Sequence, residues 1–294
     1  MIDGEKRGPL PKTEQFQEQF KWEVDHSQLI ECFVENGFVI VDSLLDPKLI
    51  SNLFRTVSSR YEELKGNFLS SNPNSNFSSA SIGICRKIVS EIERSSLFYD
   101  ITHSESLLNC LEKFLGLDLA KTAANALFIN DPIDDSPVTN KAMHQEVWTG
   151  ALPEDILVWI PLHRIESNNT MAVIPGSHFF GLLPNRNREI VCPEGFELPQ
   201  SMVLSQLEAG DAVLLHPLLV HGTHGVVGRK TRYAIHFTCK SIHTPLSNQQ
   251  KAFGYEGLRQ GPMRKIQQIL GNDYLTPLRT YGGKPLRSWD SDGN

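Results

Sequence analysis

The chain has no run of about 18 apolar residues, so the sequence predicts no membrane-spanning helix. Its five cysteines are an odd number and none stand as Cys-x-x-Cys, which argues against both a disulfide framework and a thiolate zinc site. Residues 1–15 are polar and lack the apolar core of a secretory signal. We therefore expect a cytoplasmic protein.

The chain also lacks a large excess of either positive or negative charge. The formal net charge is only −6 over 294 residues, which argues against nucleic acid or an anionic membrane as the main partner. Hydrophobic residues make up 40% of the chain and charged residues 21%, as in ordinary globular proteins. The sequence leaves open whether the chain is a monomer or a homodimer.

The organisation of the chain predicts one domain over residues 21–294, preceded by a flexible arm over residues 1–20. We expect a helical entry over about 21–120, a jelly-roll core over about 121–245, and a C-terminal helix and tail over about 246–294. No internal repeat divides these parts.

Helix signals dominate the first third. A helix should begin at His26 or Ser27 and end at Asn36-Gly37, before an apolar strand, Phe38–Val41. A second helix should follow Asp46 as N-cap, with Pro47 at its first position.

Three further expectations concern the same third. We expect Gly66 to follow the end of the second helix, and we interpret the Ser- and Asn-rich residues 70–83 as a mobile loop. Another helix is expected near 104–115.

From about residue 122 the pattern changes to short β-rich runs separated by Gly, Pro, Asn and Asp. The runs cover residues 125–130, 141–148, 155–165, 170–177, 201–207, 211–221 and 231–240. Many short strands with turn signals are typical of a sandwich or barrel. The fold class is therefore predicted as mainly β with flanking α, a double-stranded β-helix (jelly roll, cupin-like) with N-terminal helices and a helix near 262–272.

One short stretch of this region, KAMHQEVWTG (141–150), carries candidate chemistry. In a β-strand, His144, Glu146 and Trp148 would share one face. An imidazole and a carboxylate side by side can hold a metal ion, but they are equally compatible with an exposed polar pair.

A metal site built on this pair needs a further ligand. Residues 210–240 offer four histidines, His216, His221, His224 and His236. Two histidines and one carboxylate leave positions on Fe(II) open for substrate and oxygen. The same ligands suit Zn(II), so the residue types alone do not choose the metal.

Several stretches, in this order, resemble the phytanoyl-CoA dioxygenase family of Fe(II)/2-oxoglutarate oxygenases. The resemblance rests on ENGFVIVDSLLDPKLI (35–50), MHQE (143–146), AVIPGSH (172–178), GDAVLLHPLLVHGTHG (210–225), and an arginine, Arg232, placed eleven residues after His221. It covers roughly residues 28–240 and implies Fe(II), 2-oxoglutarate and O2 as cofactors.

Carried over residue by residue, the resemblance implies that iron is held by His144, Glu146 and His221. The family's commoner acid is Asp, so Glu146 is a departure, with a side chain one methylene longer. His221 is favoured over His216 and His224 because only His221 is followed by Gly-Thr and has the arginine eleven residues later.

The resemblance also implies the 2-oxoglutarate site. Arg232 would bind the distal carboxylate, Thr223 would support it, and Trp159 would lie nearby. A guanidinium fork binds a carboxylate bidentately, which suits that role on physical grounds. On a strand, Arg232 and His236 would share one face with the small Ala234, which leaves room for a dicarboxylate.

The implied function is hydroxylation of an unactivated C–H bond of a small, polar or anionic metabolite, with formation of succinate and CO2. Residues considered for substrate contact are Trp148, His236, Arg186 and Arg188. The alternatives are a zinc metallohydrolase that uses the same two histidines and glutamate, and a cupin-like binding module without catalysis.

Overall fold

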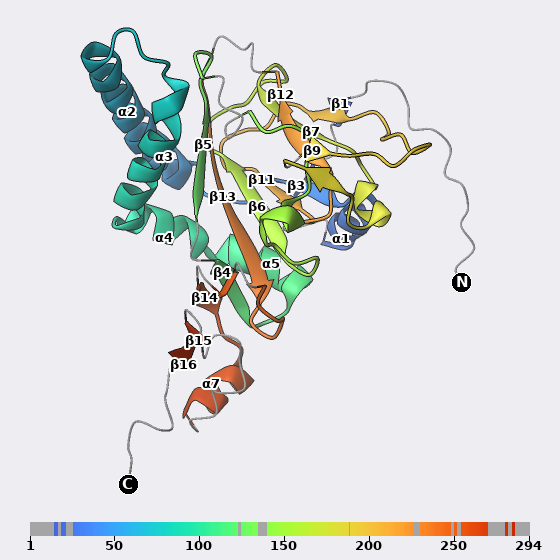
Figure 1. Cartoon of the computed structure of the whole chain (residues 1–294). Helices are drawn as coiled ribbons and strands as arrows, with labels where there is room; N and C mark the ends of the chain where they lie inside the picture. Colours follow the sequence, from blue (N-terminus) through green and yellow to red (C-terminus); the bar gives the residue numbers. More distant parts are fainter. Residues whose placement is uncertain are drawn as a thin grey trace.

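The structure is a computed structural model. It describes residues 15–16, 19–21, 26–122, 125–134, 140–187, 189–225, 230–247, 250–251, 254–269, 280–281 and 284–285. Two β-sheets form the centre of the molecule, and helices from the first third cover one of them (Figure 1).

The larger sheet has eight strands in the order β14-β4-β13-β6-β11-β3-β2, and β5 pairs with β13 beside this path. Its strands are β2 (Phe20–Lys21), β3 (Phe38–Asp42), β4 (Leu119–Thr122), β5 (Ala126–Asn130), β6 (Ile156–Pro161), β11 (Ala212–Leu215), β13 (Arg232–Ser241) and β14 (Tyr255–Arg259). The long strand β13 lies between β6 on one side and β4 and β5 on the other.

The smaller sheet has the order β1-β10-β7-β12. Its strands are β1 (Gln15–Phe16), β7 (Thr170–Val173), β10 (Met202–Leu204) and β12 (His221–His224). Two short pairs lie outside both sheets, β8 (Asn185–Arg186) with β9 (Glu189–Ile190), and β15 (Thr280–Tyr281) with β16 (Lys284–Pro285).

These sheets confirm the expected fold class. Most of the strand pairs are antiparallel, and β1–β10 and β2–β3 are parallel. The two sheets are not closed into one barrel, and together they form the open, two-sheet arrangement expected of a jelly roll.

The helices are α1 (His26–Asn36), α2 (Pro47–Ser71), α3 (Ser78–Glu93), α4 (Ser96–Thr102), α5 (Glu105–Leu115) and α7 (Pro262–Ile269), with short 3-10 helices η1 (Glu146–Thr149) and η2 (Ser177–Phe180). The cap of α2 is confirmed, because the Asp46 side chain accepts a hydrogen bond from the Lys48 amide at 2.8 Å. The α1–β3 turn is confirmed as well: Gly37 has φ of +78°, and a Cβ there would lie 2.4 Å from His178 Nδ1.

Two helix expectations were wrong. Gly66 lies inside α2 rather than after its end. The loop expected over residues 70–83 is limited to residues 72–77, because α2 continues to Ser71 and α3 begins at Ser78. Buried Ile84, Ile88 and Ile92 recur every four residues on α3, so packing of this apolar face outweighs the loop-like composition of its first turn.

The sheets also use segments that were expected to be irregular. Gln15–Phe16 and Phe20–Lys21, in or beside the expected flexible arm, pair with β10 and β3. Strand β14 adds part of the expected C-terminal tail to the edge of the larger sheet. These pairings depend on distant partners, which no local pattern identifies.

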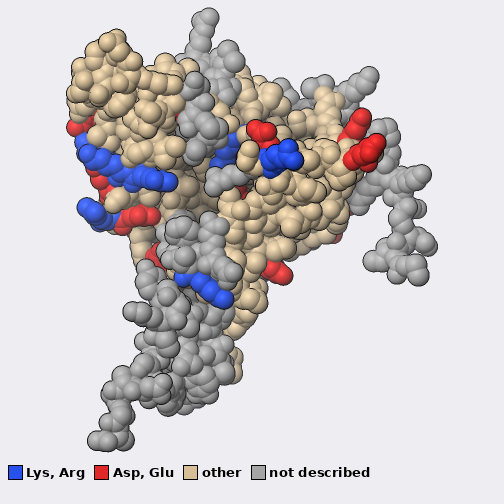
Figure 2. Space-filling view, viewed as in Figure 1, with Lys and Arg blue, Asp and Glu red and all other residues tan. Residues whose placement is uncertain are grey.

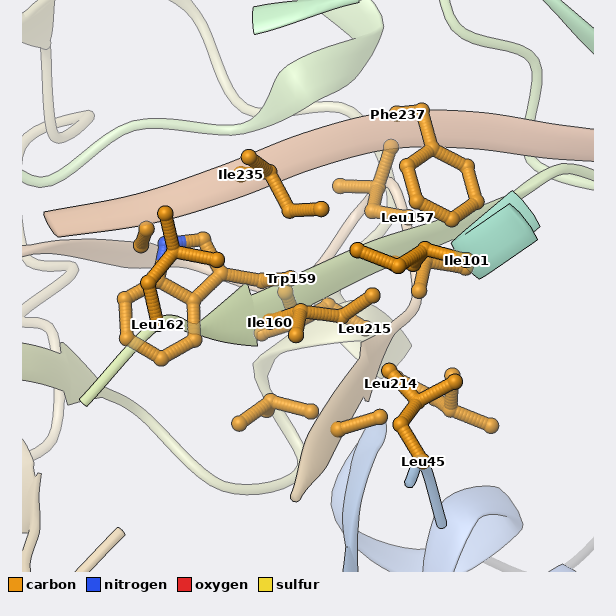
Figure 3. Packing of buried hydrophobic residues seen from close by; sticks show 14 of the residues in the cluster. Leu45, Ile101, Leu157, Trp159, Ile160, Leu162, Leu214, Leu215, Ile235 and Phe237 are labelled. Carbon is orange, nitrogen blue, oxygen red and sulfur yellow. The ribbon is translucent and has the colours of Figure 1, made fainter. Parts of the chain in front are cut away.

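Strands β6 and β11 are continuous apolar runs, and both of their faces lie in the hydrophobic core. All residues of both strands are buried, because helices cover one face of the larger sheet and the other faces the interior between the sheets. Figure 3 shows side chains of β6, β11 and β13 packing with Ile101 of α4 and with Leu45. Burying each such side chain contributes about 1.5–3 kcal/mol.

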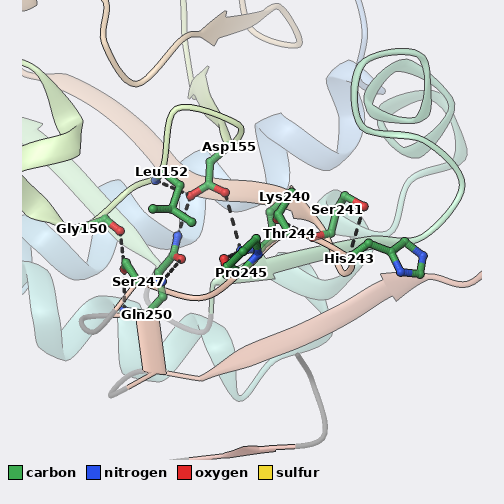
Figure 4. A network of polar contacts seen from close by, with 10 residues as sticks. All are labelled: Gly150, Leu152, Asp155, Lys240, Ser241, His243, Thr244, Pro245, Ser247 and Gln250. Atoms are coloured by element: carbon green, nitrogen blue, oxygen red, sulfur yellow. Dashed lines mark hydrogen bonds and ion pairs between the residues drawn. The ribbon is translucent and has the colours of Figure 1, made fainter. Parts of the chain in front are cut away.

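A polar network ties the segment after β13 to the segment before β6 (Figure 4). The buried Asp155 carboxylate accepts hydrogen bonds from the Leu152 amide at 2.8 Å and from Gln250 Nε2 at 2.5 Å. Ser247 Oγ donates to the Gly150 carbonyl at 2.6 Å. Burial raises the pKa of Asp155. The network fixes the position of Gln250 relative to the loop that contains Gly150.

The surface charge agrees with the composition. On the face drawn in Figure 2, Lys and Arg lie interspersed with Asp and Glu, without a broad field of one sign. Among the described residues, no helix is long and apolar enough to cross a membrane.

Candidate metal centre and its cavities

The segment that carries His144 and Glu146 is not the strand that was expected over 141–148. His144 forms one isolated bridge with His221, through the His144 amide to the His221 carbonyl at 2.8 Å and the reverse bond at 3.0 Å. At Glu146 the 3-10 helix η1 begins, and the Glu146 amide donates to the Pro217 carbonyl at 2.9 Å. The chain therefore bends between the two side chains, and both still reach the same site.

Two buried side chains hold the segments that carry the clustered residues: Gln145 holds the bend, and Ser177 holds the residue before His221. Gln145, fully buried, donates to the carbonyls of Gly181 and Leu218 at 2.8 and 2.7 Å and accepts from the Leu183 amide at 2.9 Å. Ser177 directly follows the turn at residues 175–176 in the AVIPGSH stretch, and its hydroxyl accepts a hydrogen bond from the Val220 amide at 2.8 Å. Val220 directly precedes His221, so this turn helps to set the position of the second histidine.

His144, Glu146 and His221 meet in one buried cluster. One ligand atom from each lies within 4.8 Å of the others. Glu146 Oε2 is 3.2 Å from His144 Nε2 and 3.8 Å from His221 Nε2. Metal–ligand bonds of about 2.1 Å at right angles place neighbouring ligand atoms about 3 Å apart, so the cluster has the dimensions of one face of a metal site.

The hydrogen bonds of both imidazoles prepare Nε2 as a ligand. His144 Nδ1 lies 2.8 Å from the Ala142 carbonyl, and His221 Nδ1 lies 3.0 Å from the Leu219 carbonyl. A carbonyl oxygen can only accept, so each Nδ1 carries the proton and a neutral ring keeps its lone pair on Nε2. An Nε2 lone pair and the negative Glu146 carboxylate repel each other unless a proton or a cation lies between them.

Burial and neighbouring charges set the protonation of the cluster. Burial, together with the neighbouring imidazole of His144, lowers the pKa of His221 to about 3, so the His221 ring is neutral at physiological pH. Burial alone would raise the pKa of Glu146, but the Lys141 charge and the hydrogen bond with His144 hold it well below its usual range. A neutral imidazole and an ionised carboxylate are the forms that bind a metal.

Arg232 lies buried at the start of β13, in the wall of the same cavity. Its guanidinium donates to two uncharged oxygens, the Thr170 carbonyl and Asn130 Oδ1, while its Nε has no partner. Among the described residues, no carboxylate lies within ion-pair distance of it. Burial lowers the pKa of Arg232 to about 9, which leaves the cation charged near neutral pH. A buried cation without a counter-ion fits a site for an anion.

The inner cavity joins the metal cluster to Arg232. Trp159 lines it, with its ring centroid 5.9 Å from the Arg232 guanidinium carbon, and so does Thr223. His236 lines it from β13, and burial lowers the pKa of this ring to about 4. The structure thus brings together all the residues predicted for the metal and for 2-oxoglutarate.

A second, outer cavity adjoins the first and shares part of its wall. Both are lined by Phe128, Lys141, Glu146 and His236. The rest of the outer wall is mostly uncharged and polar: Thr122, Asn125, Ala126, Thr149, Gly150, Ala151, Thr238 and Gln250. Glu146 of the metal cluster lines this second cavity, and Arg232 is not among its lining residues.

A model of the phytanoyl-CoA dioxygenase (PhyH) family matches residues 33–234, more than half of the chain. The chain belongs to this family. Membership confirms the expected enzyme class, an Fe(II)/2-oxoglutarate-dependent oxygenase that uses O2, over the zinc hydrolase and the binding module. The donor set is consistent with this class, since two histidines and one carboxylate are the ligands of non-haem Fe(II) oxygenases.

Curated relatives support the assignment. The chain is 25% identical over 252 residues to the human peroxisomal phytanoyl-CoA dioxygenase. The aligned residues cover 77% of this chain and 73% of the human protein. It is 27% identical over 233 residues to the bovine protein of the same name, covering 72% of this chain and 68% of that protein.

Solved structures share the fold. The non-heme monooxygenase ThoJ, in its apo form, aligns with a TM-score of 0.57 at 18% identity, over 84% of this chain and 93% of that one. The epimerase SnoN, in complex with Fe3+, alpha ketoglutarate and nogalamycin RO, aligns with a TM-score of 0.53 at 13% identity, over 76% and 86% of the two chains.

The residues predicted for substrate contact lie in different places. His236 lines both cavities, whereas Trp148 packs against the apolar cluster of Ile174, Leu183 and Val220. Arg186 is exposed on the β8–β9 hairpin and lines neither cavity. Arg188 lies outside the described residues.

The other histidines are not part of the cluster. His216 accepts a hydrogen bond from the Leu218 amide at 3.1 Å and packs near Phe33, and His224 is exposed. Lys141 and Asn130 also contribute to the site, and the sequence analysis missed both. Lys141 lies three residues before His144, so its position was the available signal, while Asn130 gave none.

Proposed function

We propose that this oxygenase hydroxylates an unactivated C–H bond of a small, polar or anionic metabolite, with formation of succinate and CO2. The observation that carries the proposal is that one cavity contains both the His144–Glu146–His221 cluster and the buried Arg232, which has no counter-ion among the residues that the structure describes. The outer cavity then leaves space for a substrate beside the cluster.

The three clustered side chains would hold the iron. When bound, iron and 2-oxoglutarate supply the oxidising chemistry that removes hydrogen from an unactivated C–H bond and delivers oxygen to the carbon. The protein contributes the geometry: Thr149 Oγ1 donates to Glu146 Oε1 at 2.6 Å, which leaves Oε2 directed at the histidines. The carbonyl partners of the two Nδ1 atoms fix the ring orientations.

Arg232 would bind the distal carboxylate of 2-oxoglutarate. Its fork is held on the cavity wall by two oxygens, so its direction is set before the ligand arrives. Thr223 would support this carboxylate, and the Trp159 ring would contact the cosubstrate. The apolar side chains of Met171 and Leu215 line the same space and limit water near the charge pair.

Lys141 is the feature that favours an anionic substrate. Its ammonium lies 3.7 Å from Glu146 Oε2 and 4.9 Å from the centre of the Phe128 ring, and it lines both cavities. If Glu146 held iron, its charge would be shared with the metal, and Lys141 would then face the outer cavity without that carboxylate as its counter-ion. A carboxylate or phosphate group on the substrate would restore the balance.

The lining of the outer cavity favours a polar substrate over a long acyl chain. Hydroxyl and amide side chains, among them Thr122, Asn125 and Gln250, outnumber the large apolar ones, of which Phe128 is the example. A polar substrate can form further hydrogen bonds with these groups, whereas a branched hydrocarbon chain cannot. An acyl thioester is therefore the second candidate substrate.

The test measures succinate release with Fe(II), 2-oxoglutarate and a panel of small hydroxy acids, amino acids and sugar phosphates, alongside acyl-CoA thioesters. Small anions should stimulate turnover and should fail to do so in Lys141→Met, while Lys141→Arg keeps part of the effect. Lys48→Met, an exposed lysine on α2, is the matched control. Stimulation by thioesters alone would contradict the proposed substrate class.

Cytoplasmic location, the single domain over 21–294 and the monomeric or homodimeric state remain predictions. The mammalian relatives named above are peroxisomal by name. Fractionation of cells that express the chain would test the location.

A further inference from the structure

The groups that the Arg232 guanidinium contacts decide whether its positive charge is available to a ligand. A guanidinium is normally buried opposite a carboxylate, because an unpaired buried charge is costly. Here both described acceptors are uncharged, the Thr170 main-chain carbonyl and the side-chain oxygen of Asn130. Of these two acceptors, only the Asn130 oxygen belongs to a side chain, so only this one depends on which residue stands at the position.

The strand pairing of the larger sheet places Asn130 beside Arg232. It ends β5, and the β5–β13 register sets it directly opposite Arg232, at the first residue of β13. Residues opposite one another in an antiparallel pair share a face, so the amide reaches the guanidinium across the ladder. Asn130 is fully buried, with no exposed surface.

Neighbouring amides fix which end of Asn130 faces the arginine. A guanidinium has only donors, so the Asn130 oxygen must point toward it. The amide nitrogen then donates to Asn140 Oδ1 at 2.9 Å, and Asn140 donates in turn to the Asp134 carbonyl at 2.8 Å. Asn169 Nδ2 donates to the Asn130 main-chain carbonyl at 3.3 Å. The orientation is thus determined by contacts on several sides.

We propose that Asn130 is a positioning residue for 2-oxoglutarate: it orients the Arg232 fork while leaving its positive charge free for the ligand. This inference rests on the proposed assignment of Arg232 to the distal carboxylate. An aspartate at the same place has nearly the same shape but is an anion. It would pair with Arg232 and compete with the carboxylate of 2-oxoglutarate for the same charge.

The competition has a clear consequence for two variants. Asn130→Asp should weaken 2-oxoglutarate binding by about ten- to hundredfold, because the ligand must displace an internal ion pair. Asn130→Ala should weaken it by less than about fivefold, since the charge stays available and only one orienting bond is lost. Both variants lose the hydrogen bond to Asn140, so the alanine variant is the matched control for that loss.

The measurement is a titration of 2-oxoglutarate into the Fe(II)-loaded protein by calorimetry without oxygen, which requires no turnover. Iron stoichiometry and thermal unfolding of the metal-free protein are recorded for the same three proteins. We expect iron binding to be unchanged. We also expect Asn130→Asp to unfold at or above the temperature of Asn130→Ala, although it binds 2-oxoglutarate more weakly.

A purely structural role would produce a different order. Alanine would then be the worse variant in both stability and cosubstrate affinity, and that result would overturn the inference. Wild-type affinity in Asn130→Asp would overturn it too. If the wild-type protein itself failed to bind 2-oxoglutarate, the proposed function would fall, and the two failures are therefore distinguishable.

Discussion

Replacing Arg232 by alanine should weaken 2-oxoglutarate binding far more than iron binding. Within the described chain the guanidinium touches two uncharged oxygens, so no internal carboxylate shares its charge. Loss of one partner from a charge-assisted, bidentate pair in a partly dry cavity costs about 2–4 kcal/mol. At about 1.4 kcal/mol for each tenfold change, the affinity should fall roughly 30- to 700-fold.

The lysine variant separates charge from geometry. Arg232→Lys keeps a cation but loses the planar fork, so its affinity should lie between those of the wild type and Arg232→Ala. Arg55→Ala removes an exposed arginine on α2 and should behave as the wild type. The assay is an anaerobic titration of 2-oxoglutarate into each Fe(II)-loaded protein. Unchanged affinity in Arg232→Ala, with normal iron content, would refute the assignment.

Three further predictions concern the metal cluster and a nearby histidine. His144→Ala or His221→Ala should abolish both iron binding and succinate formation, whereas His216→Ala should keep normal iron stoichiometry; metal analysis of the purified variants decides this. Glu146→Asp should keep part of the activity because it restores the family's commoner ligand, while Glu146→Ala should lose hydroxylation, and full turnover in the alanine variant would remove this carboxylate from the iron. Burial, aided by the charge of a nearby imidazole, lowers the pKa of His216 to about 4. Its contribution to stability is therefore present above the unfolded pKa of about 6.5 and is lost as the pH falls through 6.5 toward 4, by about 1–3 kcal/mol. Urea unfolding at several pH values should show a shallower loss in His216→Asn than in the wild type, with His224→Asn as the exposed control.

The sequence predicted the fold class because its signals are local. Strand-like runs, the Asp46 cap and the Gly37 turn each depend on a few consecutive residues, and all three are found in the structure. Residues 70–83 show the limit of such reasoning. Their composition is typical of a loop, but the buried isoleucines of α3 gain more from packing on the sheet and on neighbouring helices than the local preference costs.

The candidate site was also predicted from the sequence only in part. The spacing from His221 to Arg232 and the His-x-Glu motif are visible in the sequence, and the structure brings these residues together. The strand expected around Glu146 was wrong, because hydrogen bonds to the distant Pro217 carbonyl bend the chain into η1. A pattern with a period of two residues cannot show such a bend.

The sequence by itself determined which residue types are present for metal and carboxylate binding, since this chemistry follows from the side chains and their order. The order and spacing of the motifs already favoured His221 as the second histidine, whereas only the tertiary structure decided which oxygens surround the Arg232 guanidinium. Asn130 and Arg232 are 102 positions apart in the chain and meet because β5 and β13 are paired in one register. Such pairing depends on the whole sheet and not on the residues near either side chain, so the uncharged partner of Arg232 could not be found from the sequence.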